Sequence, residues 1–114
     1  MPARLSYLEL PVARAARSRD FYAAAFGWRF TDFGPSYAST MTGDTDIGLQ
    51  AGEEGRTAAA LPVIQVDALE AAQAAIEAAG GVVTLPIFAF PGGRRFHFRD
   101  PDGHELAAMQ ADGT

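Results

Sequence analysis

The stretch RRFHFRDPDGHELAAMQ, residues 94–110, contains two short runs of alternating residues separated by a tight turn. The turn, Asp100-Pro101-Asp102-Gly103, offers a side-chain acceptor first, a proline with a fixed φ second and a permissive glycine fourth. This order is typical of a type I turn. We therefore predict a β-hairpin here. Whether the hairpin carries chemistry depends on which face of each strand its side chains occupy.

The composition is that of one ordinary globular domain, residues 1–114, with 48% hydrophobic and 20% charged residues. The absence of cysteine excludes disulfides and thiolate chemistry. No apolar run approaches the roughly 20 residues of a membrane span, so we expect a cytoplasmic protein that contacts no membrane. A formal net charge of −5 argues against nucleic acid as a partner and leaves a small molecule or a protein.

A strand, a helix and three further strands occur twice, and sliding the chain by roughly fifty residues superposes the two copies. Module one, about 4–52, has extended stretches around a helix at 13–27, namely 5–12, 28–33, 36–41 and 46–51. Module two, about 61–111, has extended stretches around a helix at 67–81, namely 61–66, 82–88, 94–99 and 104–110. The sequence thus predicts two βαβββ modules.

The second helix carries its own start signal and apolar stripe. Asp67 is suited to cap it, and Glu70 completes the spacing of a capping box. The residues expected to line the stripe are Leu69, Ala72, Ile76 and Ala79.

Alternation along the strands assigns two faces, because successive side chains point to opposite sides. The aliphatic and aromatic set is expected under the helices: Leu8, Leu10, Val12, Ile64, Val66, Phe96, Phe98, Leu106 and Ala108. The opposite face mixes polar and apolar residues: Tyr7, Glu9, Gln50, Val63, Gln65, Arg95, His97, Arg99, Glu105, Ala107 and Met109. A mixed face of this kind is typical of a ligand cleft.

Three segments carry a resemblance to a known family: FYAAAFGW at 21–28, QVDALEAAQAAIEAAGG at 65–81 and PGGRRFHFRDPDGHEL at 91–106. Together with the repeated βαβββ pattern, they resemble the vicinal oxygen chelate superfamily, which includes glyoxalase I, bleomycin-resistance proteins and extradiol dioxygenases. The resemblance implies an α+β fold in which two tandem βαβββ modules form a curved mixed sheet with two helices on its outer face. It also implies a homodimer. Its motifs are specific for the fold, whereas binding proteins and enzymes share them.

The resemblance further implies four metal-ligand positions, one on the first and one on the last strand of each module. In this chain they fall at Tyr7, Gly48, Leu61 and Ala107. None offers the carboxylate, imidazole or amide donors that such a site uses, so we expect no metal and no other cofactor. The alternative is a divalent metal at a displaced site, because Gln50 and Glu105 each lie two residues from an expected position.

The predicted ligand-binding residues are Tyr7, Glu9, Gln50, Gln65, Arg95, His97, Glu105 and Met109. A buried Glu9 needs a hydrogen-bond or cationic partner, for which Arg95 and His97 are candidates. His97 precedes Ala107 by ten residues, the spacing at which the resemblance to extradiol dioxygenases places a catalytic tyrosine. It could therefore transfer protons or only line the cleft.

A stacking cage of aromatic residues is a further possibility, although core and interface packing explains the same residues more simply. The residues concerned are Trp28, Phe30, Phe33, Tyr37, Phe88 and Phe90.

Two functions remain. The first is a metal-free protein that binds a small, partly apolar molecule. The second is a lyase, isomerase, cyclase or dioxygenase that uses His97 or Glu9 as acid or base, or that uses a displaced metal.

Overall fold

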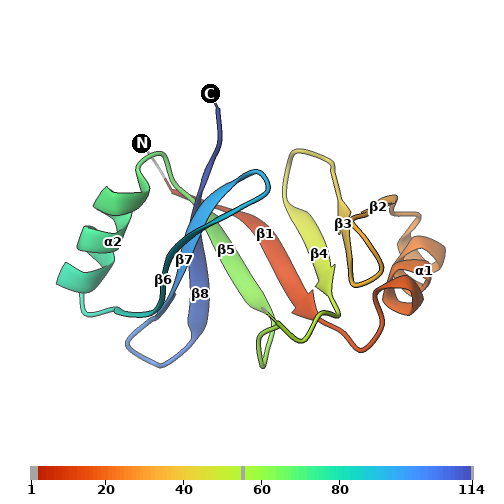
Figure 1. Ribbon diagram of the computed structural model, residues 1–114, viewed down its shortest axis with the longest axis horizontal. Coiled ribbons are helices and arrows are strands. Elements are labelled where there is room, and N and C mark those ends of the chain that lie inside the picture. Colours follow the sequence, from red (N-terminus) through yellow and green to blue (C-terminus); the bar gives the residue numbers. More distant parts are fainter. Residues whose placement is uncertain (1–2, 55, 114) are drawn as a thin grey trace. The chain divides into compact units, whose positions relative to one another are not determined.

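The computed structural model describes residues 3–54 and 56–113 and contains two βαβββ modules (Figure 1). Module one consists of β1 (Arg4–Pro11), α1 (Ala15–Phe26), β2 (Phe30–Asp32), β3 (Tyr37–Thr40) and β4 (Asp46–Gln50). Module two consists of β5 (Leu61–Gln65), α2 (Leu69–Ala78), β6 (Val82–Phe90), β7 (Gly93–Arg99) and β8 (Glu105–Ala111). The predicted α+β class and the repeated strand and helix order are confirmed.

Both modules follow the same path. The strand order is β2-β3-β4-β1 in module one and β5-β8-β7-β6 in module two. In each, the first strand pairs in parallel with the last, and the remaining pairs are antiparallel. A parallel pair needs a long connection, which α1, β2 and β3 supply between β1 and β4, and α2, β6 and β7 supply between β5 and β8. Among the described residues, no helix is long and apolar enough to cross a membrane.

The predicted hairpin is formed by β7 and β8, which run side by side (Figure 1). The Gly103 amide donates to the Asp100 carbonyl at 2.9 Å, and the Asp100 carboxylate accepts from the amides of Asp102 and His104 at 3.0 and 2.9 Å. Gly103 takes a φ of 89°, which a residue with a side chain rarely adopts. The residues Asp100–Gly103 therefore form the turn that their types predict.

The core of module two lies between α2 and its sheet. Leu69, Phe96 and Ala108 are at most 1% exposed, with Ile76 and Phe98 among the residues packed against them. The face assignment of Phe96, Phe98 and Ala108 to the helix side is thereby confirmed.

The predicted start of α2 is wrong in its capping residue. The helix begins at Leu69 after Ala68, and no side chain of its own segment caps it. Instead, the Leu69 amide donates to Oε1 of Gln110 on β8 at 2.9 Å. Glu70, expected in a capping box, forms an exposed ion pair with Arg94 on β7 at 2.7 Å. A distant strand therefore supplies the cap that the local sequence was expected to supply.

The end of α2 also differs from prediction. The helix ends at Ala78, and Ala79, which was expected on its apolar stripe, is an exposed C-cap residue.

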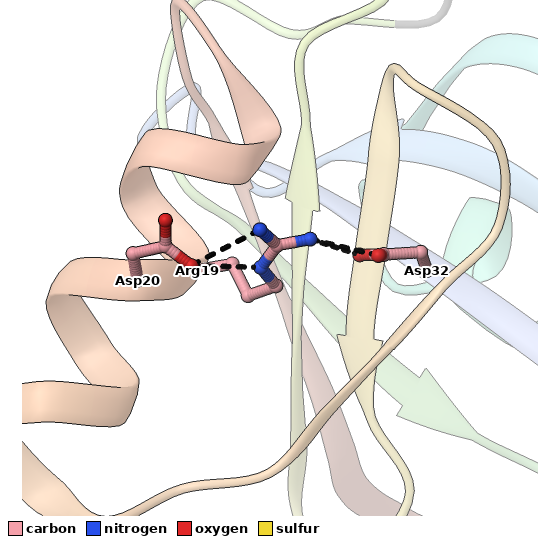
Figure 2. Close-up of polar contacts among 3 residues, drawn as sticks. All are labelled: Arg19, Asp20 and Asp32. Carbon is pink, nitrogen blue, oxygen red and sulfur yellow. Dashed lines mark hydrogen bonds and ion pairs between the residues drawn. The ribbon is translucent and has the colours of Figure 1, made fainter.

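Helix α1 is tied to the edge strand of module one by an exposed ion pair between Arg19 and Asp32. Arg19 Nη1 lies 2.9 and 2.7 Å from the two carboxylate oxygens of Asp32 on β2, and the same guanidinium contacts Asp20 at 3.0 Å (Figure 2). The helix ends at Gly27, whose φ of 72° reverses the chain. Only Ala15 of this helix is buried, and Phe26 is 61% exposed.

The turn between β3 and β4 is organised around Asp46. Its Oδ1 accepts from the Thr40 hydroxyl and from the amide and hydroxyl of Thr42 at 2.7 to 2.8 Å, and its Oδ2 accepts from the Gly43 amide at 3.0 Å. Partial burial pushes the pKa of Asp46 upward, but these hydrogen bonds outweigh it and hold the pKa below its ordinary value.

We predict that Gln110→Ala lowers the free energy of unfolding by about 1 kcal/mol, because the first turn of α2 loses its acceptor. Gln110→Glu keeps an acceptor and adds a charge that suits a helix N-terminus, so it should be close to wild type. Urea denaturation of both variants measures this. Equal losses in the two would contradict the capping role.

We predict that Asp46→Asn is less stable than wild type by about 1 kcal/mol near neutral pH, because hydrogen bonds to a charged acceptor are lost. A carboxyl whose pKa is lowered by folding stabilises the folded state above its unfolded pKa, and this contribution disappears as pH falls through the folded pKa. The difference in unfolding free energy should therefore shrink in acid. Asp44→Asn, in the same turn, is the control and should show no difference at either pH.

Candidate ligand-binding site

The mixed face of module one is organised around a position without a side chain. Glu9 on β1, Gly48 on β4 and Ser39 on β3 are register partners and therefore form one row across the strands. Because Gly48 has no side chain, the middle of this row is open. The hydroxyl groups of Tyr7 and Tyr37 occupy that space.

Four side chains here, Tyr7, Glu9, Tyr37 and Ser39, form a hydrogen-bonded group that we term the tyrosine cluster. The hydroxyl oxygens of Tyr7 and Tyr37 lie 2.5 Å apart, and the Tyr7 hydroxyl donates to Ser39 Oγ at 2.8 Å. The Tyr37 hydroxyl donates to Glu9 Oε1 at 3.1 Å. Glu9 is 3% exposed, so this hydrogen bond supplies a buried carboxylate with a partner.

The tyrosine cluster occupies the space beside Gly48 where a side chain would lie. A Cβ atom built on Gly48 would collide with the hydroxyl oxygens of Tyr7 and Tyr37 and with Cζ of Tyr7. The two phenol groups therefore fill the space that a side chain on this part of β4 would use.

The tyrosine hydroxyls are held in their protonated form. Burial is the largest cause that raises the pKa of Tyr7 and of Tyr37, and the neighbouring Glu9 carboxylate raises both further. Protonated phenols donate hydrogen bonds, whereas a metal ligand would have to be a phenolate. The cluster is therefore chemically a set of donors around one carboxylate.

Gln50 contributes little to this face through its amide oxygen, because Oε1 accepts from the Gly52 amide at 2.8 Å. The side chain thus bends back onto its own loop. Gln50 stays a predicted ligand residue.

Module two brings five of the predicted residues onto one face. Gln65, Met109 and Arg95 are register partners across β5, β8 and β7, and His97 lies in the next row, opposite Ala107. The Arg95 guanidinium stacks at 5.3 and 5.5 Å from the ring centroids of Phe88 and Phe90 on β6. The fifth residue, Glu105, is described with His97 below.

His97 is almost fully buried and contacts Glu105. Its Nδ1 lies 3.1 Å from Oε2 of Glu105, while its side chain is 5% and that of Glu105 is 28% exposed. The Phe88 ring lies at a centroid distance of 6.0 Å from the imidazole. In the described part of the chain, the buried Nε2 atom of His97 has no hydrogen-bond partner.

The four metal-ligand positions implied by the resemblance hold residues that do not fit a divalent metal. In module one they are Tyr7, with its raised pKa, and Gly48, whose side-chain space holds two hydroxyls. In module two they are Leu61 and Ala107, which are 1% and 0% exposed and aliphatic. Among residues 3–54 and 56–113, no group of three histidine, cysteine or acidic side chains is placed to hold a metal ion.

The sequence does not indicate Tyr37 as a polar partner of this face, nor Ser39 as a member of it. Their register opposite Gln50 and Gly48 places them on the mixed face, but register between strands is not visible in one sequence. Phe88 and Phe90 are expected from the sequence only as members of an aromatic cage.

The aromatic residues considered for that cage belong to separate local groups. Trp28 packs against Tyr22 and Phe26 of α1 at centroid distances of 5.8 and 5.0 Å. Phe88 and Phe90 instead flank Arg95.

A family model for the glyoxalase/bleomycin resistance protein/dioxygenase superfamily matches residues 4–108. The chain therefore belongs to this superfamily, and the resemblance seen in the sequence is confirmed. A search of curated proteins found no match.

Solved structures share the fold at low sequence identity. A Legionella pneumophila protein described as an NAD-dependent benzaldehyde dehydrogenase is 20% identical, with a TM-score of 0.76 over 97% of this chain and 100% of that one. Methylmalonyl-CoA epimerase from Mycobacterium tuberculosis is 11% identical, with a TM-score of 0.74 over 96% of this chain and 88% of that one. The Mn(II)-bound glyoxalase from Novosphingobium aromaticivorans is 21% identical, with a TM-score of 0.66 over 95% and 38%.

We predict that Gly48→Ala destabilises the protein by about 1 to 3 kcal/mol, because the added methyl group must displace the tyrosine hydroxyls. The cost should be smaller when the same change is made in a Tyr37→Phe background, where one of the two hydroxyls is absent. Thermal and urea unfolding of the four proteins gives the coupling. Equal costs in both backgrounds would show that the cluster does not set the requirement for glycine.

Proposed function

We propose that this protein binds a small, partly apolar molecule without the help of a divalent metal. The observation that carries the proposal is the collision at Gly48. The place of a ligand side chain on β4 is taken by the hydroxyls of Tyr7 and Tyr37, which are already engaged with Ser39 and Glu9. A metal there would require the cluster to be taken apart.

The face of module two supports the binding of a small molecule. It combines the aromatic rings of Phe88 and Phe90 with the polar groups of Arg95 and His97. Few polar groups on an apolar wall are typical of small-molecule sites. A relative with a bound ligand is consistent with this. A Streptomyces coelicolor methylmalonyl-CoA epimerase variant, 14% identical with a TM-score of 0.73, was solved with 2-nitronate-propionyl-CoA.

We expect less than one tenth of a divalent metal ion per chain, as a rough bound set by the unsuitable donors, after dialysis against a mild chelator. Elemental analysis of the purified protein measures the content. In parallel, a thermal-shift screen of small molecules should give the same stabilising compounds with and without chelator, because binding raises the melting temperature by mass action. About one tightly held metal per chain, or compounds that stabilise only with metal, would overturn the proposal.

A second candidate is an enzyme of the same superfamily that moves a proton with His97 or Glu9. The His97–Glu105 contact favours it, because a carboxylate beside an imidazole is a common arrangement in general acid–base catalysis. Turnover of a compound from the screen that drops about a hundredfold in His97→Gln, with binding largely kept, would favour the enzyme. A displaced metal at Gln50 and Glu105 is less well supported, since both side chains already have partners.

The homodimer, the cytoplasmic location and the absence of a nucleic-acid partner stay predictions. Sedimentation velocity measures the first.

A further inference from the structure

We infer that Glu105 is a positioning residue that fixes the tautomer of His97, so that Nε2 accepts a hydrogen bond from a hydroxyl group of an apolar ligand. The inference rests on the proposed small-molecule binding and adds to it the chemical class of the ligand and the atom that recognises it.

The His97–Glu105 contact determines which ring nitrogen of His97 carries the proton. An ionised carboxylate only accepts hydrogen bonds, so the atom that faces it must carry a proton. The atom facing Glu105 Oε2 at 3.1 Å is Nδ1 of His97. In the neutral ring, the proton therefore sits on Nδ1 and Nε2 holds a lone pair.

The Nε2 atom of His97 is buried and unpaired. His97 is 4% exposed, and its Nε2 has no hydrogen-bond partner in the described ranges. Buried polar atoms are nearly always hydrogen-bonded, and an unpaired one lowers stability. The fold thus keeps in place an acceptor that it does not itself satisfy.

The register partners of His97 across the sheet are aliphatic residues. Register pairing places Val63, Ala107, His97 and Leu85 in one row across β5, β8, β7 and β6. We term these four residues the apolar row, because all of them except His97 have aliphatic side chains. Val63 and Ala107 are 3% and 0% exposed. One basic nitrogen in an apolar row suits an apolar molecule with one hydroxyl at its edge.

The aromatic ring of Phe88, beside His97, further narrows the class of ligand. Phe88 lies 6.0 Å from the imidazole with an interplanar angle of 50°. A ring beside the acceptor favours a flat ligand, because aromatic groups pack at such distances. If the ligand hydroxyl is acidic, its O–H bond breaks, the electron pair stays on oxygen and the proton forms an Nε2–H bond. The Glu105 carboxylate then stabilises the resulting imidazolium.

Other charges share this face and belong in any pH dependence. They are Glu105 on β8, and Arg95 and Arg99 on β7 itself; the described residues of β5 and β6 carry no titratable side chain.

The tautomer is tested by nitrogen NMR of histidine-labelled protein. We expect His97 to show a protonated Nδ1 and an unprotonated Nε2 in wild type and in Glu105→Gln, whose amide oxygen still accepts. Glu105→Leu should lose this preference. His104, exposed beside the turn, is the internal control. A proton on Nε2 in wild type, or the same tautomer in Glu105→Leu, would overturn the positioning role. This readout does not depend on any ligand or metal.

The ligand class is tested with para-methylphenol and toluene, which differ only in a hydroxyl group that stays protonated near neutral pH. Para-methylphenol should bind wild type about three- to tenfold more tightly than toluene, the range expected for one hydrogen bond. His97→Leu and Glu105→Leu should reduce that preference, Glu105→Gln should largely restore it, and His104→Leu should leave it unchanged. Melting temperatures identify any variant that fails to fold.

The outcomes separate this inference from the proposed function. Equal binding of the two probes, or binding of neither, would reject the hydroxyl class even if the screen finds other ligands. Tight metal binding would reject the proposed function and leave the tautomer result standing.

Discussion

Buried polar atoms need hydrogen-bond partners, and this constraint accounts for specific contacts in both modules. It draws Tyr37 and Ser39 to the buried carboxylate and phenol of module one. It recruits Gln110 to the amide of Leu69 at the start of α2. It also sets the orientation of His97, whose Nδ1 meets Glu105. In each case, the partner comes from a different strand or element than the group it satisfies.

The two modules share a chain path but use the constraint differently. In module one, the hydroxyls of Tyr7, Tyr37 and Ser39 and one oxygen of the Glu9 carboxylate hydrogen-bond to one another beside Gly48. In module two, Nε2 of His97 is buried without a hydrogen-bond partner among the described residues, beside Phe88. The same chain path thus carries different polar arrangements in its two copies. Fold membership alone does not tell these apart.

The position of Gly48 connects this difference to the superfamily. A side chain there would be needed to hold a metal from β4, and it would have to displace the hydroxyls of Tyr7 and Tyr37. The raised pKa of Tyr7 and of Tyr37 adds a chemical reason, since a protonated phenol is a poor ligand for a divalent ion. Steric and electrostatic arguments therefore both disfavour a metal at this position.

The sequence by itself determined the elements and their faces. Period-two alternation placed Phe96 and Phe98 under α2 and His97 opposite them, and the DPDG turn set the hairpin, because both depend on residues close together in the chain. Tertiary structure alone decided the partners. The cap of α2 came from Gln110, some forty residues away, in place of Asp67, and Tyr37, which was not expected as a polar group, donates to Glu9. Those pairings depend on strand register and on how the helix packs on the sheet, and both are fixed only when the whole module folds.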